Sequence, residues 1–257
     1  MNLIISLIKR DFRFTFKNIL LRNIFFSVIF FIFSFLTVMK STRIGVDNIN
    51  LFYIQFKGIK NVGELPFIWL IINFFIIFNL GDNFYNDLRK NGKYVLVRCR
   101  NLKYFYIVKV FLLICNTIIY YILLFGIMFL LSKIFLNPAE VALIEGININ
   151  NKELIRTLIL LYTTTSISLV LIQNMLSLAI KPKYSSLIIV VILLLSVIIN
   201  SSILPGQHCL ILRHVPFDNI TNLTLIKSVL YNLILSAITV MVGYGIFLKK
   251  DIYWEDE

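Results

Sequence analysis

The sequence is poor in acidic residues, cysteine and histidine. Among its 257 residues are 13 Asp and Glu, three Cys and two His. An odd number of cysteines at spacings unlike any metal motif predicts buried or idle thiols and no disulfide framework. His208 and His214 have no third ligand at metal-site spacing, so we expect surface histidines and no metal centre. The absence of an HExxH motif and of paired Asp within apolar runs argues against an intramembrane protease.

The sequence also lacks a phosphate-binding loop. Its only Gly-Lys pair, Gly92-Lys93, is followed by tyrosine and has no upstream glycine at the required spacing. We therefore expect that the chain is not an enzyme, hydrolyses no ATP by itself and binds no cofactor. No series of Asp, Glu or His crosses the apolar segments, which argues against a proton- or sodium-coupled carrier.

Apolar residues are abundant instead. Hydrophobic residues make up 59% of the chain and charged residues 15%, against about 45–50% and 25% in soluble domains. A membrane-spanning helix needs about 20 residues, and six apolar runs have roughly that length: 22–39, 64–81, 104–132, 154–179, 184–200 and 226–248. The sequence predicts an all-α polytopic membrane protein with six transmembrane helices in one domain, residues 1–257.

Several features refine this topology. The third run would reach past a hydrocarbon core of about 30 Å, so we expect its start near Lys109 to project into the cytosol, with that lysine snorkelling to the interface. The motif Lys181-Pro182-Lys183 predicts a tight turn between the fourth and fifth helices. The segment 200–225 fits a lid or short re-entrant segment as well as an ordinary surface loop.

Residues 1–20 alternate apolar and basic side chains at helical spacing. This pattern predicts an amphipathic interfacial helix in the headgroup region, although a simple flank of the first span is an alternative. Placing both termini, the loop 81–103 and the turn 181–183 in the cytosol gives 16 Lys and Arg inside and nine outside, out of 25. The positive-inside rule therefore predicts cytoplasmic N and C termini. The net charge of +12 fits this topology and anionic lipid better than nucleic acid.

Polar side chains inside the apolar runs point to two alternatives. Such groups avoid lipid and either bond neighbouring helices or face a wet cavity. Helix–helix bonding is the simpler interpretation, and a translocation path is the functional one. The candidates for that path are Asn73, Asn79, Asn116, Thr164, Gln173 and Asn174.

The most distinctive polar feature is the basic stretch from Gly92 to Asn101, continued by Lys103 to Lys109 at the entry to the third helix. With its topology, this stretch resembles the permease subunits of ABC-2-type transporters, the type V exporter fold. The resemblance implies a coupling helix within 82–100 that docks onto a separate nucleotide-binding subunit, which would hold ATP and Mg. An amphipathic helix there could insert apolar side chains into the partner while basic ones set the register. The residues concerned are Phe84, Tyr85, Leu88, Arg89, Lys90 and Lys93.

The function expected from this resemblance is ATP-driven export of an amphipathic or apolar cargo, such as an antimicrobial or toxin-like peptide. The partners would be the ATPase subunit, a second permease chain in a homo- or heterodimer, and membrane lipid. Abundant Ile and Asn are typical of an AT-rich bacterial genome, so we expect a bacterial cell membrane. The alternative is a non-transporting membrane scaffold or sensor partner whose basic loop recruits a cytosolic protein.

Overall fold

A computed structural model describes residues 2–12, 17–43, 51–59, 66–81, 83–98, 102–135, 141–144, 147–218 and 222–249. Its elements are, in chain order, α1 (Asn2–Asp11), α2 (Lys17–Arg43), α3 (Leu51–Phe56), α4 (Phe67–Leu80), α5 (Asn83–Arg98), α6 (Leu102–Phe135), β1 (Val141–Ile144), β2 (Ile147–Asn150), α7 (Asn151–Ala179), α8 (Pro182–Ile198), the 3-10 helices η2 (Pro205–Cys209) and η3 (Ile211–Arg213), and α9 (Leu225–Lys249). Within these described ranges the architecture is helical apart from one short antiparallel hairpin.

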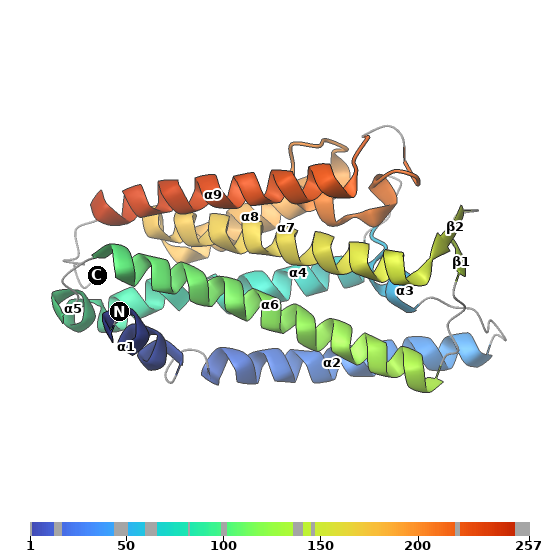
Figure 1. Ribbon diagram of the computed structural model, residues 1–257, viewed down its shortest axis with the longest axis horizontal. Coiled ribbons are helices and arrows are strands. Elements are labelled where there is room, and N and C mark those ends of the chain that lie inside the picture. The colour runs from blue at the N-terminus through green and yellow to red at the C-terminus, as the bar shows by residue number, and fades with distance from the viewer. Residues whose placement is uncertain are drawn as a thin grey trace.

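The long helices form one elongated bundle (Figure 1). Helices α1 and α5 lie at the end where α9 finishes, whereas β1, β2 and the segment between α8 and α9 lie at the opposite end. Five stretches are long and apolar enough to cross a membrane: Lys17–Lys40, Phe67–Arg89, Leu102–Phe135, Asn151–Ala179 and Leu225–Lys249. Helix α8 is apolar but shorter. The predicted helical architecture with several helices of membrane-spanning length and composition is thus confirmed, and a multi-pass membrane protein is compatible with it.

The turn between α7 and α8 follows the prediction. Helix α7 ends at Ala179 and α8 begins at Pro182, where a proline at the first turn costs no intrahelical hydrogen bond. The two helices pack against each other. They form the expected antiparallel hairpin.

Helix α7 makes its most extensive packing contact with α9. Asn232 of α9 donates from Nδ2 to Thr165 Oγ1 at 3.0 Å and accepts from Ser168 Oγ at 3.1 Å. All three side chains are buried. At this position the polar side chains form hydrogen bonds between neighbouring helices, which was the simpler alternative to a translocation path.

The N-terminal region differs from the prediction. The expected helix over 1–20 is divided, because α1 ends at Asp11 and α2 already begins at Lys17. Ile19 is buried in the main core, so apolar packing recruits these residues into the first long helix. Helix α3 and the β1–β2 hairpin were not predicted, since both are shorter than the apolar runs on which the expectation rested. Residues 64 and 65 of the expected second span lie outside the described part.

The segment between α8 and α9 is folded into the bundle. Residues 205–214, here called the cap segment, are all buried. A Cβ added at Gly206 would lie 2.6 Å from Ser196 Oγ, so this contact with α8 requires glycine. The alternative of an ordinary surface loop is wrong for these residues. So is the expectation of surface histidines, because His208 and His214 are both buried.

A buried ionic cluster as candidate functional site

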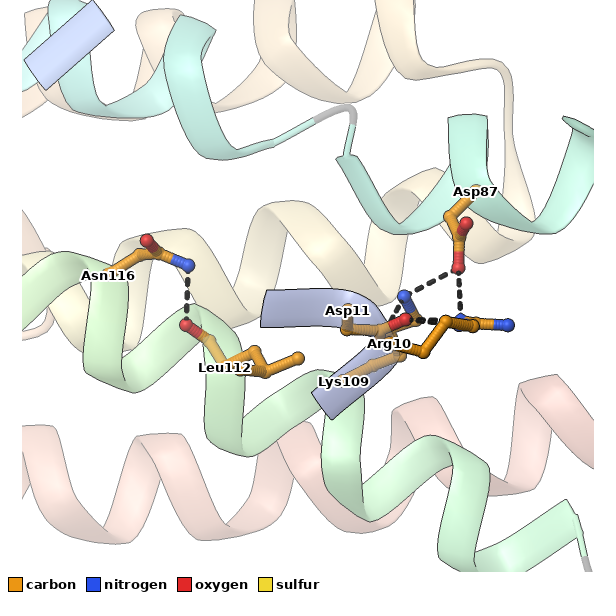
Figure 2. A network of polar contacts seen from close by, with 6 residues as sticks. All are labelled: Arg10, Asp11, Asp87, Lys109, Leu112 and Asn116. Carbon is orange, nitrogen blue, oxygen red and sulfur yellow. Dashed lines mark hydrogen bonds and ion pairs between the residues drawn. The ribbon is translucent and has the colours of Figure 1, made fainter. Parts of the chain in front are cut away.

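Four charged side chains meet where α1 and α5 pack against the first turns of α6 (Figure 2). Arg10 and Asp11 come from the end of α1, Asp87 from α5 and Lys109 from α6. We call these four residues the ionic cluster. It joins α1 to the consecutive helices α5 and α6, and the contact between Arg10 and Asp87 spans 77 positions of the sequence.

Lys109 lies at the centre of the cluster. Its Nζ is 2.5 Å from Asp11 Oδ2 and 2.5 Å from Asp87 Oδ2. Arg10 approaches the same aspartate, with Nη2 3.1 Å from Asp87 Oδ2, and donates from Nε to Asp11 Oδ1 at 2.7 Å. The ring of Phe105 covers the lysine, with Nζ 5.5 Å from its centroid.

The cluster is buried and balanced in charge. Lys109 is 5% exposed, Asp11 2% and Asp87 9%. Removing ions from water costs several kcal/mol each unless partners compensate, and here two cations face two carboxylates. The expectation that Lys109 snorkels is therefore wrong: its ammonium turns inward because Asp11 and Asp87 supply acceptors that the sequence pattern did not reveal.

Apolar packing fastens α5 to the same place. Phe84 and Leu88 are buried in a core cluster with Phe105, Tyr106 and Phe247. Ring centroids of Phe84 and Phe247 are 6.0 Å apart. Phe84 and Leu88 were expected as anchors inserted into a partner, and the structure corrects this, because their apolar surface is covered by the chain's own α6 and α9.

The remaining docking candidates lie differently. Arg89 is exposed and Tyr85 half-buried. Lys90 and Lys93 belong to α5, but their side chains lie outside the described part. The same holds for most side chains of the basic stretch 92–101. A docking role for the outer side of α5 stays a prediction.

A small cavity adjoins the ionic cluster. Its volume is about 20 Å³, and its polar lining comes from Asp11, Asn83, Lys109 and Asn116. A cavity of about 10–15 Å³ or more can hold one water. Asn116 donates from Nδ2 to Leu112 O at 2.8 Å (Figure 2), and its buried Oδ1 has no hydrogen-bond partner within the described residues.

The other path candidates are dispersed over α4 and α7. Asn73 donates to Trp69 O at 2.8 Å, Asn79 donates to Asn23 Oδ1 at 2.6 Å, and Thr164 donates to Leu160 O at 2.7 Å. Gln173 and Asn174 are buried. Several amide atoms among these side chains have no hydrogen-bond partner in the described part: Asn73 Oδ1, Asn79 Oδ1, Asn174 Oδ1, Gln173 Oε1 and Gln173 Nε2.

Sequence reasoning missed Arg10, Asp11 and Asp87 as site residues, and Asn23 as the partner of Asn79. A signal was present, because Asp11 and Asp87 are acidic residues within strongly basic segments of a chain poor in acidic residues. Such isolated carboxylates are candidates for buried partners of the one lysine in an apolar run. Cys115 and Cys209 are free thiols, and Cys99 lies outside the described part.

No group of three or more His, Cys, Asp or Glu that could hold a metal ion occurs in the described segments. The contacts of the ionic cluster are charge pairs between helices.

Comparison with known proteins gives one family. No curated protein matches the chain, and no solved structure matches it. A family model described as "Protein of unknown function (DUF2705)" matches residues 28–253, which include α4 to α9, Asp87 and Lys109. The chain belongs to the DUF2705 family.

Proposed function

We propose that this chain is the membrane subunit of an ATP-driven exporter and that a separate subunit hydrolyses the ATP. The observation that carries the proposal is the attachment of α5 to the base of α6. Asp87 pairs with Lys109 at 2.5 Å, and Phe84 is buried beside it. A soluble partner that moved α5 would therefore also move a long apolar helix.

The position of α5 supports this role. It follows α4 directly and lies outside the long bundle, at the same end as α1 and the end of α9 (Figure 1). Arg89 on its outer side is exposed, as a residue that sets register with a partner would be. In this proposal α8 is the sixth span, and the α5 end of the bundle faces the cytosol, in agreement with the bias of basic residues.

The buried amides support a transport role. An unsatisfied buried polar group costs about 1–3 kcal/mol, and native proteins have few of them. Unpartnered amide atoms of Asn79, Asn116 and Gln173 occur on α4, α6 and α7. In the proposal these groups are hydrated or bind cargo when the helices separate. A path lined by amides and aromatic rings suits an amphipathic peptide.

Reconstitution with the ATPase subunit that the proposal requires tests it. The complex should hydrolyse ATP faster when an amphipathic peptide cargo is added, and the isolated chain should not hydrolyse ATP. The variant Asp87→Asn should retain the subunit but lose the stimulation, whereas Arg156→Gln, an exposed change on α7, should not. A complex that forms but never responds to cargo would favour the scaffold alternative instead.

A further inference from the structure

The two histidines of the chain meet at one serine hydroxyl. His208 Nδ1 is 2.9 Å from Ser228 Oγ, and His214 Nε2 is 2.9 Å from the same oxygen. The histidines belong to the cap segment and Ser228 to the first turn of α9. All three side chains are buried. This contact lies at the opposite end of the bundle from the ionic cluster (Figure 1).

The second nitrogen of each ring faces a backbone carbonyl. His208 Nε2 is 2.9 Å from Ser202 O, and His214 Nδ1 is 3.1 Å from Leu210 O. A carbonyl oxygen only accepts hydrogen bonds, so both of these ring nitrogens carry a hydrogen. In the neutral state of each ring, the nitrogen that faces Ser228 is then an acceptor.

The number of hydrogens is too small for four hydrogen bonds. Two neutral imidazoles and one hydroxyl supply three polar hydrogens, whereas the cluster has four contacts at 2.9 to 3.1 Å. The hydroxyl of Ser228 can donate to only one ring. With both rings neutral, one of the four contacts therefore has no hydrogen between its two atoms, whichever tautomers are chosen.

We propose that His208, Ser228 and His214 form a site that binds a single proton. The added proton makes one ring an imidazolium, which donates to Ser228 Oγ while that hydroxyl donates to the other ring. All four contacts are then hydrogen bonds. A second proton would place two like charges on either side of one hydroxyl in a buried site, which the low local polarity opposes.

The surroundings of the site set where it titrates. The ring of Tyr231 stacks on His208 with centroids 4.2 Å apart. The cap segment and the elements packed against it also carry Cys209 in η2, Arg213 in η3 with Asp218 near it, Lys227 on α9, and Tyr162 on α7 near Cys209. On α8 the polar groups facing the cap segment include the carbonyls of Ser196 and Val197, to which Arg213 donates.

Burial opposes the charged form in this site. It lowers the pKa of His208 from the ordinary 6.5 to about 4, and it lowers the pKa of His214. The neutral cluster lacks one hydrogen bond that protonation supplies, and this gain favours the protonated form and raises the pKa. We therefore expect a midpoint between about 4 and 6.5 for the shared proton.

The chain contains only two histidines, so histidine-selective ¹⁵N labelling of the full chain in lipid nanodiscs reports on this site alone. From pH 7.5 to 4, the ring nitrogen signals should record uptake of one proton summed over both residues. Two independent protonations near the ordinary pKa, or no protonation before the protein unfolds, would overturn the proposal.

Two variants test the hydrogen count. In His208→Phe, one ring and one hydroxyl supply two hydrogens for two contacts, so His214 should stay neutral at the wild-type midpoint. In Ser228→Ala, the shared acceptor is gone, and the proton affinity should fall about tenfold or more, at least one pH unit. The control Ser236→Ala removes a hydroxyl that donates to Asn232 O on the same helix and should leave the midpoint unchanged. Unchanged midpoints in both test variants would show that the histidines titrate without sharing.

Discussion

Lys109 Nζ and Asp87 Oδ2 lie 2.5 Å apart although 22 positions separate them in the sequence, and this pair connects α5 to α6. Phe105 lies one turn before the lysine on α6 and contacts Phe84 of α5, with ring centroids 6.1 Å apart. The charge pair and the ring contact thus fasten the same two helices side by side. They attach α5 firmly to the end of the bundle.

Breaking the ionic cluster should destabilise the protein. Lys109→Gln leaves two buried carboxylates with one cation fewer, and loss of one partner of a buried pair costs about 3–5 kcal/mol. We expect a lower thermal unfolding temperature in detergent. The double variant Lys109→Gln with Asp87→Asn should be less destabilised than the sum of the single variants, because it removes one charge of each sign. Additive effects would contradict the coupling inferred for this pair.

Substitutions at Phe84 and Arg89 should affect different properties, the first the amount of folded protein and the second the binding of the ATPase subunit. Phe84→Ala removes a buried ring, and such changes cost about 3–5 kcal/mol, so the amount of folded protein in membranes should fall. Arg89→Glu changes an exposed side chain and should leave that amount unchanged while reducing co-purification of the ATPase subunit, more so at low salt, where exposed charges are less screened. Equal co-purification of wild type and Arg89→Glu would argue against docking on this side of α5.

Arg213 should hold the cap segment closed. Its buried guanidinium donates to Ser196 O at 2.7 Å and to Val197 O at 2.8 Å in the last turn of α8, and to Gln207 Oε1 at 2.6 Å. Arg213→Met removes these donors, and each buried acceptor left unsatisfied costs about 1–3 kcal/mol. Opening of the cap segment should then expose Cys209.

Thiol alkylation measures this opening. Burial raises the pKa of Cys209 to about 12, so its reaction with iodoacetamide at neutral pH should be slow in the wild type. With Cys99 and Cys115 changed to serine, the rate should rise about tenfold or more in Arg213→Met, for an opening cost reduced by about 1.4 kcal/mol or more. Lys227→Met, an exposed change nearby, is the control and should leave the rate unchanged.

Acid should weaken the fold through the histidines. The pKa of His208 is lowered to about 4 by burial, so between pH 6.5 and about 4 the unfolded chain binds more protons than the folded chain. The contribution of these groups to stability is therefore complete above pH 6.5 and decreases as the pH falls through this range. As the pH falls, the unfolding temperature should decrease less steeply in the double variant His208→Phe with His214→Phe than in the wild type. Identical pH profiles would exclude the histidines as the cause.

The orientation of the chain in the membrane can be measured with single cysteines introduced at Asn91 and Asn151 in a variant that has no other cysteines. A membrane-impermeant thiol reagent added to intact cells should label position 151 and not position 91, because the bias of basic residues places Asn91 in the cytosol. Opening the cells should make position 91 reactive. Labelling of position 91 from outside would reverse the proposed orientation.

Much of the fold follows from local features of the sequence. Runs of apolar residues of spanning length predicted the long helices, since a helix in lipid must satisfy its own backbone hydrogen bonds. The proline at position 182 with flanking lysines predicted the turn between α7 and α8. These features need no information about distant parts of the chain.

The tertiary structure decided what covers each helix face. Helical periodicity marks Phe84 and Leu88 as one apolar side of α5, but the same pattern fits a soluble partner or the chain's own α6 and α9. Likewise, a lysine near the end of a span can snorkel or turn inward, and the choice at Lys109 depended on two carboxylates supplied by α1 and α5. Sequence periodicity fixes the direction of a side chain relative to its own helix, whereas its partner depends on how distant helices pack.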